Sequence, residues 1–367
     1  MIIKNLTALG LYGGASLNSI ELALINTDGI DVKEFIKTSI IPYPEYLSNE
    51  IRSVLGKRVL NFEYLEKNSE VQKIREMISE FYVDTIKEFT DIDNVDVIGI
   101  DSLTICNDPQ NKCSYQIENG QIICSGLNKN IITHFHKADL LSGGQASPLS
   151  PAFLNALALG SEKPILFIDL EAVSSLIYIG ESGELMAFDC SPGLALIEDW
   201  TFRHANMQTD YNGKLAITGN IDEQIVNLLL NAKILKKQPP KSLDILDFSD
   251  KKEHLEGLSL EDGAATASYF IANAIYQSAC KFIPDIPDNI YVCGEGLKNP
   301  SLMRFLKHCF SPYELKNISD INDELSTIGA QSTAFNAVRR YYSLPITFPT
   351  TTGAYEPMTG GEFYEKK

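Results

Sequence analysis

Five segments of the 367-residue chain combine glycine or proline with polar side chains close to predicted strand ends, where ligands bind in α/β proteins. They are residues 12–19, 134–139, 142–149, 189–193 and 293–296. Three of them carry acid–base groups: imidazoles and a carboxylate in the second, and one carboxylate each in the fourth and the fifth. None has the spacing of a Walker loop or a dinucleotide fingerprint, so their chemistry must be inferred residue by residue.

His134 and His136 are two residues apart, so on a strand both imidazoles would face the same side. Together with Asp139 they would imitate a metal site. No further His or Cys lies nearby in the sequence, and the alternative is a partly exposed polar strand end. The sequence favours this alternative and leaves the metal undefined.

Asp189, Pro192 and Gly193 precede a helix that is predicted to begin at Leu194. The N–H groups at its start could face an anion, and the carboxylate could hold Mg²⁺ through water. An ordinary N-cap and turn explains the same residues, so both interpretations stay open.

Gln145 and Ser147 have side chains that could hydrogen-bond a sugar, or they could serve only to pack a loop. Cys190 and Cys293 lie at predicted strand ends without a cationic neighbour in the sequence, and we expect them to be buried, unreactive thiols.

The strands and helices that carry these segments are predicted in the same order in both halves of the chain. In the first half, apolar periodicity predicts three strands, one long helix or two abutting ones, and a further strand; the ranges are 6–11, 20–24, a strand after Gly29, 64–89 and 95–100. The second half predicts strands at 165–168, 176–179, 185–188 and 290–293, with helices at 194–206, 222–235, 260–282, 300–309 and 323–342. The pattern predicts two β-β-β-α-β-α lobes, 1–130 and 131–367, with 344–367 packing back on the first lobe.

The composition restricts the classes of molecule that the protein is expected to bind. The 31 Lys and Arg against 48 Asp and Glu give a net charge of −17, which disfavours nucleic acid and anionic membrane surfaces. The seven cysteines form no C-x-x-C pair, as expected of reduced thiols in a cytosol. No run reaches the roughly 18 apolar residues of a spanning helix, so we expect a cytoplasmic protein.

Over almost its whole length the chain resembles the anhydro-N-acetylmuramic acid kinase family. The most specific match is GGQASPLSPAF at 143–153, close to the family's G-G-Q-G-A-P-L-V-P-A-F. Further matches lie at 189–193 with Trp200 downstream, 239–242, 293–294 with 299–303, and 344–354. The resemblance implies an α/β chain with the duplicated actin-like (RNase H-like) two-lobed kinase fold, an interlobe cleft for the nucleotide and a homodimer.

The resemblance also implies ATP and Mg²⁺ as cofactors and 1,6-anhydro-N-acetylmuramic acid as the substrate in cell-wall recycling. Water opens the anhydro ring at C1, and the freed sixth oxygen takes the γ-phosphate. The implied nucleotide contacts are Gly13, Gly14, Ser16, Asn18, Gly294 and Gly296. The implied sugar contacts are Gln145, Ser147, Asp189, Pro192 and Gly193, and His134 falls at the position of the family's catalytic Asp.

The chain departs from the family at the groups that the reaction needs. The phosphate loop S-G-T-S-L-D-G loses two hydroxyls, and its Asp becomes Asn18. The paired glycines of N-L-G-G-I-A-N become Glu171 and Ala172, and Glu295 replaces the middle glycine of G-G-G. A carboxylate beside a triphosphate would repel it by ~1 to 4 kcal/mol.

Three functions are therefore open: an impaired kinase with His134 as base, a non-catalytic pseudokinase that binds a sugar or a protein partner, and a structural remnant. One positioned acid–base group is worth ~10²–10⁴-fold in rate. The sequence thus predicts weak ATP binding and an impaired or lost reaction.

Overall fold

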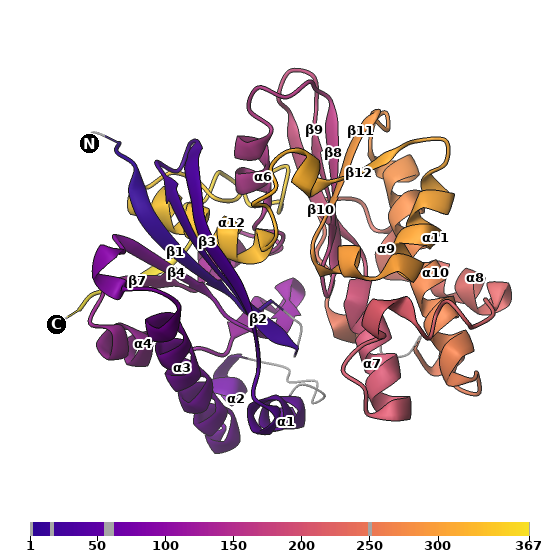
Figure 1. Cartoon of the computed structure of the whole chain (residues 1–367), viewed down its shortest axis with the longest axis horizontal. Coiled ribbons are helices and arrows are strands. Elements are labelled where there is room, and N and C mark those ends of the chain that lie inside the picture. Colours follow the sequence, from indigo (N-terminus) through magenta and orange to yellow (C-terminus); the bar gives the residue numbers. More distant parts are fainter. Residues whose placement is uncertain (1–2, 15–17, 55–61, 249–251, 367) are drawn as a thin grey trace. The chain divides into compact units, whose positions relative to one another are not determined.

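The chain divides into two units in the computed structural model, which describes residues 3–14, 18–54, 62–248 and 252–366. Unit 1 comprises Met1–Leu159 and Ser326–Lys367, and unit 2 comprises Gly160–Leu325 (Figure 1). The division therefore does not fall after residue 130, because the strand and helices that follow this residue pack within unit 1. Residues 344–367 fall within the first unit.

Unit 1 is built on a six-stranded sheet in the order β13-β7-β4-β1-β2-β3. The first three strands form an antiparallel meander, and β4 pairs in parallel with both β1 and β7. The strands are β1 Leu6–Tyr12, β2 Ser19–Thr27, β3 Val32–Pro42, β4 Val97–Asp101, β7 Ile131–Thr133 and β13 Glu362–Tyr364, with a separate hairpin of β5 Thr104–Asp108 and β6 Cys113–Gln116.

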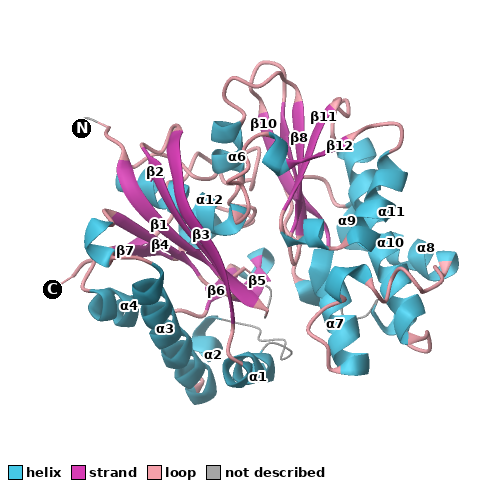
Figure 2. Cartoon of the chain, viewed as in Figure 1, coloured by secondary structure: helices cyan, strands magenta, loops and turns pink. Residues whose placement is uncertain are grey.

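Helices cover both faces of this sheet (Figure 2). They are α1 Glu45–Val54, α2 Phe62–Lys67, α3 Ser69–Phe89, α4 Gly120–Leu127, α5 Phe135–Leu141, α6 Pro151–Leu157 and α12 Ile328–Tyr341. Leu9 and Leu11 of β1 share a core with α1, α3 and α4, whereas α12 packs on the opposite face. There Gly10 allows close approach, because a Cβ at this position would lie 2.0 Å from the Ala330 carbonyl oxygen.

Unit 2 repeats the strand arrangement of unit 1. Its five-stranded sheet has the order β10-β9-β8-β11-β12, in which β8, β9 and β10 form the meander and β11 pairs in parallel with β8. The elements are β8 Ile165–Leu170, β9 Ser174–Ile179, β10 Leu185–Ser191, β11 Asn289–Cys293 and β12 Leu315–Asn317, with α7 Gly193–Ala205, α8 Glu223–Leu230, α9 Lys233–Lys236, α10 Leu260–Phe282 and α11 Pro300–Phe310.

The core of unit 2 centres on Trp200 of α7, which is fully buried. Its indole Nε1 donates to the Leu260 carbonyl oxygen at 2.9 Å, and the ring leaves no room for a Cβ at Gly263 of α10. Leu166 and Ile168 of β8 join the same core. The two helices are thereby fixed against the sheet that carries the predicted site segments.

Several elements differ from the sequence expectation. The predicted elements omit α1, the β5–β6 hairpin, α4, α6 and the short strands β7, β12 and β13. The predicted helix 222–235 is two helices, because Ala232 leaves helical geometry with ψ 130°. The strand expected around His134 and His136 is wrong, since α5 begins at Phe135.

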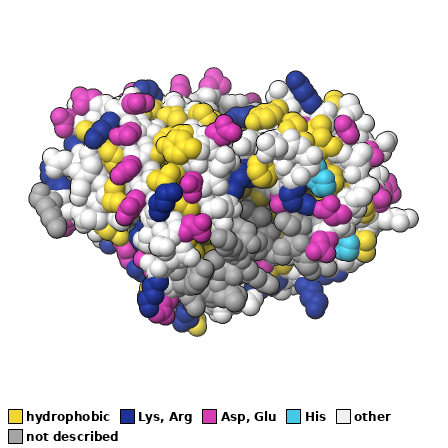
Figure 3. All heavy atoms as spheres, turned by 90° about the horizontal axis from the view of Figure 1, so that it is seen from below, with side chains coloured by type: hydrophobic (Ala, Val, Ile, Leu, Met, Phe, Trp, Pro, Cys, Tyr) yellow, Lys and Arg dark blue, Asp and Glu magenta, His cyan; other side chains and the backbone are white. Residues whose placement is uncertain are grey.

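The surface carries mixed charge. On the face seen in Figure 3, acidic and basic side chains are interspersed. No helix in the described part of the chain is both long and apolar enough to cross a membrane.

Candidate functional site

In unit 1 the parallel strands β1, β4 and β7 end at the same edge of the sheet. We call this the ligand edge of unit 1, formed by residues 13–14, 101–102 and 133–134, because ligands of open α/β sheets bind at the carboxyl ends of parallel strands. The Gly13 N–H donates to the Asp101 carbonyl oxygen at 2.8 Å, which ties the first two strand ends together. The fold thus brings the first glycine segment and His134 to one edge.

Gly13 and Gly14 are required by packing. A Cβ on Gly13 would lie 2.7 Å from the Leu103 backbone nitrogen, and Gly14 has a left-handed φ of 56°. The Gly14 carbonyl oxygen accepts from the Thr104 N–H at 2.9 Å. These contacts account for both glycines as parts of a turn, and phosphate binding by them stays a prediction.

Two other predicted nucleotide contacts belong to the same loop. The Asn18 carbonyl oxygen accepts from the Tyr43 N–H at 3.2 Å, which fastens the loop to the region before α1. Ser16 lies outside the described residues.

His134 is the residue that precedes α5, with a left-handed φ of 55°. Its side chain is 16% exposed, and its Nδ1 lies 3.4 Å from Oε1 of the fully buried Glu118. The same Oε1 accepts a hydrogen bond from the Thr133 hydroxyl. Burial raises the pKa of Glu118 from its usual value. An imidazole backed by a carboxyl group is an arrangement that can accept a proton.

Sequence reasoning missed Glu118. It follows β6 in a stretch without other charged residues nearby, and it is 16 residues from His134 in the chain. Nothing in its local sequence marks a partner. The neighbours come together because the chain passes through α4 and β7 and returns to the same edge.

His136 has a different environment from His134 and does not share a metal site with it. Its Nε2 lies 3.0 Å from Asp101 Oδ1 and its Nδ1 2.6 Å from the Ala146 carbonyl oxygen. Asp139 accepts from the Ala146 N–H at 2.8 Å and from the Thr352 hydroxyl at 2.5 Å. The described residues contain no group of three or more His, Cys, Asp or Glu that could hold a metal ion.

Asp139 also shapes the loop with the most specific family motif. A Cβ on Gly144 would lie 2.1 Å from Asp139 Oδ2, so glycine is needed beside this carboxylate. The Gln145 N–H donates to the Thr352 carbonyl oxygen at 2.8 Å. Gln145 and Ser147 are themselves partly exposed on this fixed loop. Their predicted contact with a sugar is compatible with this position.

In unit 2 the parallel strands β8 and β11 also end at one edge, where Glu171 and Gly294 follow them. Gly294 has a φ of 88°, and its Cβ would lie 2.7 Å from the Leu170 carbonyl oxygen. A Cβ on Gly296 would lie 2.5 Å from that of Leu170. The glycine turn therefore packs directly on the end of β8.

A carboxylate already contacts this turn. Glu171 Oε1 accepts a hydrogen bond from the Glu295 N–H at 3.2 Å. The side chain of Glu295 points to Lys298, with 3.4 Å between Oε1 and Nζ. A backbone N–H that could serve an anionic ligand is thus occupied by an anionic side chain of the same unit.

Asp189 is buried, and its carboxylate is held by protein donors. The Ser175 hydroxyl donates to Oδ1 at 2.6 Å and the Leu243 N–H to Oδ2 at 2.9 Å. Burial raises the pKa of Asp189 to about 6. These contacts indicate a structural role, and the predicted water-mediated hold on Mg²⁺ has no support in them.

The start of α7 likewise offers little to an anion. The Gly193 N–H donates to Ser191 Oγ at 3.3 Å, and the Leu194 N–H donates to the Glu171 carbonyl oxygen at 3.0 Å. Pro192 has no N–H to donate. These N–H groups are satisfied within the unit, and contact of this helix start with an anionic ligand stays a prediction.

All seven cysteines are free in the structure. Cys190 and Cys293 are buried as predicted. Burial raises the pKa of the Cys190 thiol well above its usual value, which disfavours the reactive thiolate.

The strand order of the two sheets defines the class of protein. Each unit has a three-strand meander whose first strand pairs in parallel with a fourth, the arrangement of the duplicated actin-like kinases and ATPases. A sequence profile described as anhydro-N-acetylmuramic acid kinase matches residues 6–366. The chain belongs to the anhydro-N-acetylmuramic acid kinase family.

Relatives of that name support the assignment. One from Paramagnetospirillum magneticum is 32% identical over 363 residues, covering 97% of this chain and 99% of the relative. One from Rhodospirillum rubrum is 33% identical over 360 residues, covering 97% and 94%. Among solved structures, component A of (R)-2-hydroxyglutaryl-CoA dehydratase from Acidaminococcus fermentans aligns with 92% of this chain and 99% of its own, at 11% identity and a TM-score of 0.45.

Proposed function

We propose that this chain is a slow ATP-dependent kinase of 1,6-anhydro-N-acetylmuramic acid in the cytoplasm, with His134 as its base. In the reaction, a water oxygen bonds to C1 and the bond from C1 to the sixth oxygen breaks. That oxygen takes the γ-phosphoryl group of ATP, and the water gives one proton to the base. The products are N-acetylmuramic acid 6-phosphate and ADP.

The position of His134 carries this proposal. The residue follows β7 at the ligand edge of unit 1, and its imidazole is partly exposed. Within the described part of the chain, its Nε2 has no hydrogen-bond partner. A base needs an accessible lone pair and a fixed orientation, and both are compatible with this position.

The glycine turn at 294–296, which the family resemblance assigns to the nucleotide, supports a low rate of phosphoryl transfer. The Glu171 carboxylate occupies the Glu295 N–H, and it would repel a nearby phosphate by ~1 to 4 kcal/mol. Mg²⁺ in phosphoryl transfer neutralises charge on the phosphates. The described residues contain no group of three or more His, Cys, Asp or Glu side chains that could hold a metal ion, so we expect Mg²⁺ to be held mainly by the phosphates of ATP and by water. Weak ATP binding is therefore part of the proposal.

The test is ADP release by the purified protein with Mg-ATP, with and without the anhydro sugar, and mass spectrometry of the sugar product. We expect slow ADP release that requires the sugar and falls at least tenfold in His134→Ala. His308→Ala, which changes an exposed imidazole, is the matched control and keeps the wild-type rate. ADP release that does not depend on the sugar, or none at all, would reject the kinase proposal.

A second candidate is a non-catalytic sugar-binding protein, and the Glu171 contact favours it. If an internal carboxylate fills the nucleotide turn, the loop at 142–149 could still bind the amino sugar. Sugar-dependent thermal stabilisation without any calorimetric signal for Mg-ATP would select this function.

A further inference from the structure

We propose that Glu118 is the positioning residue of a Glu118–His134 pair in which the carboxylate holds the imidazole ready to accept a proton at Nε2. The inference rests on the proposed function, since it assigns a second residue to the base of that reaction. It assigns the proton transfer to a pair of residues rather than to a single carboxylate.

The first argument is the orientation of the ring. Nδ1 of His134 lies 3.4 Å from Glu118 Oε1, so the carboxylate favours a proton on this nitrogen. In a neutral imidazole the other nitrogen then carries the lone pair. The tautomer that results has its accepting atom on Nε2, away from the carboxylate. The same division of roles operates in Ser-His-Asp triads.

The second argument is the cost of Glu118 to the fold. Its carboxyl group is fully buried, and Oε2 has no hydrogen-bond partner among the described residues. A buried oxygen without a donor destabilises the folded state. Side chains with such a cost are concentrated at functional sites. A role in orienting the adjacent imidazole would explain why a destabilising carboxyl group lies at this position.

The third argument is the packing around the pair. The Tyr364 ring of β13 lies 6.2 Å from the His134 ring, centre to centre, and it fills the space where Gly120 would carry a Cβ. Arg75 of α3 donates to the Glu118 carbonyl oxygen at 2.9 Å. The other charged group that acts on Glu118 is Asp101 of β4. In these surroundings the negative charge of Glu118 can stabilise the positive charge that the ring gains when it takes a proton.

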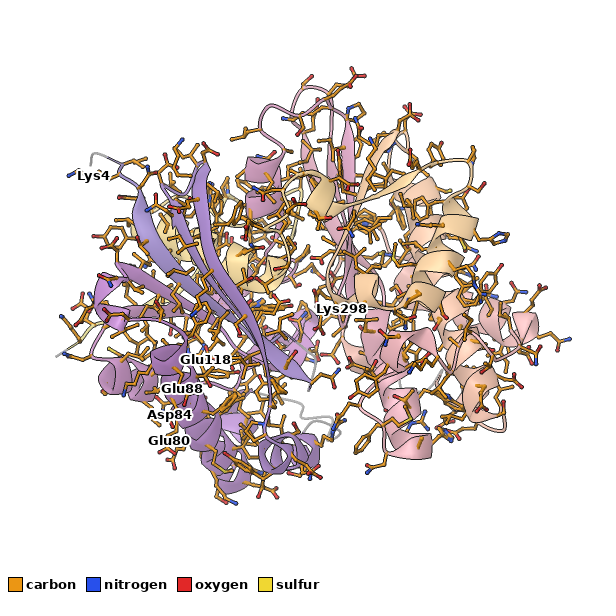
Figure 4. All side chains as sticks on the ribbon, viewed as in Figure 1. Lys4, Glu80, Asp84, Glu88, Glu118 and Lys298 are labelled. Atoms are coloured by element: carbon orange, nitrogen blue, oxygen red, sulfur yellow. The ribbon has the colours of Figure 1, made fainter. Side chains whose placement is uncertain are left out.

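Two variants remove the negative charge that faces Nδ1 of His134. Glu118→Gln keeps the shape and an acceptor oxygen, and Glu118→Met removes both charge and acceptor. We expect kcat to fall roughly 10- to 100-fold in both, the range typical of lost orienting partners, with KM for the sugar changed less than twofold. The Glu118→Met, His134→Ala double variant should be no slower than His134→Ala alone. Glu80→Gln, an exposed glutamate on α3 labelled with Glu118 in Figure 4, is the control and keeps the wild-type kcat.

A readout without turnover keeps the inference testable. Nitrogen-15 NMR of the His134 imidazole should show the Nδ1–H tautomer in the wild type and a shift toward Nε2–H in Glu118→Met. We also expect the melting temperature of Glu118→Met to equal or exceed that of the wild type, because a buried carboxyl group is removed.

The outcomes distinguish the two proposals. An inactive wild type with the expected tautomer rejects the kinase proposal and retains the pairing. An active wild type whose kcat is insensitive to both Glu118 variants rejects the positioning role. Loss of kcat together with a fall of several degrees in melting temperature in both variants would show that Glu118 is only structural, which also overturns the inference.

Discussion

His136 and Asp101 form a buried ion pair at the carboxyl end of β4, with 3.0 Å between Nε2 and Oδ1. The other ring nitrogen donates to the Ala146 carbonyl oxygen at 2.6 Å. Both neighbours are acceptors, so they favour the imidazolium form, in which both ring nitrogens donate. Burial lowers the pKa of His136, but Asp101, Ala146 and Asp139 raise it more, so the net shift is upward.

This pair predicts a pH-dependent stability. The pKa of His136 is raised in the folded state above its usual 6.5, so the pair stabilises fully below about pH 6.5, and the stabilisation is lost as the pH rises through the folded pKa. Asp101→Asn should lower the free energy of unfolding by about 3 kcal/mol at pH 6 and by less at pH 9. Urea denaturation at both pH values measures it. The control His308→Gln should lie on the wild-type curve, and an equal loss at both pH values would contradict a charged His136.

Restoring the family's base residue alone should fail. His134→Asp would put a second carboxylate beside the buried Glu118, and two close carboxylates cannot both ionise at neutral pH. We expect this variant to be at least tenfold slower than the wild type in the ADP-release assay. His134→Asp combined with Glu118→Gly, which removes the conflict, should be faster than His134→Asp. A large gain from the single change would mean that residue 134 alone limits the rate and that Glu118 does not conflict with a carboxylate there.

Removing the carboxylate at the glycine turn should improve nucleotide binding. Glu171→Ala frees the Glu295 N–H and removes a repelling charge, so Mg-ATP should bind roughly tenfold more tightly, equivalent to about 1.4 kcal/mol. Isothermal titration calorimetry measures the Kd. Glu181→Ala, an exposed carboxylate in the turn between β9 and β10, should leave it unchanged. Equal Kd values for Glu171→Ala and the wild type would show that Glu171 does not affect the nucleotide.

The buried carboxyl group of Asp189 predicts a second pH dependence of stability, in which burial rather than a charged partner raises the pKa. Because burial raises its pKa from 3.8 to about 6, the folded chain binds this proton more tightly than the unfolded chain. The wild type therefore loses stability as the pH rises from about 4 to 6, by about 3 kcal/mol for two pKa units. Asp189→Asn lacks this titration, so its stability relative to the wild type should increase by that amount between pH 4 and pH 7. Asp285→Asn, at an exposed position, should show no such change.

The fold was largely predictable because the two meanders have strong local signals. Alternating residues such as Leu22 and Leu24, and turns at Gly29 and Gly183, specify antiparallel strands without reference to the rest of the chain. The unit boundary was not predictable in this way. It depends on α12, whose Ala330 packs on β1 more than 300 residues earlier in the chain.

The sequence predicted where the candidate site residues lie, but it did not predict which side chains contact them. His134, Gly13 and Gly294 do lie at strand ends, as their sequence context indicated. The partners Glu118 and Asp101 could not be identified, because a lone carboxylate has no local pattern. The pairing of β4 with β7 brings Asp101 to this edge, and Glu118 is brought there by the hydrogen bond from the Ile117 N–H to the Leu103 carbonyl oxygen. Likewise, the Glu171 contact depends on the parallel pairing of β8 with β11.

The discontinuity of unit 1 has a consequence for biosynthesis. Its last helix, α12, is translated after the whole of unit 2, yet it covers β1 and β4. On the ribosome, the part of unit 1 that precedes Gly160 therefore exposes the sheet face around Gly10 and Gly99 until α12 has been translated, whereas residues 160–325 can fold as soon as they emerge. Release of a truncated chain that ends before Ser326 would leave an intact second unit attached to an aggregation-prone first one.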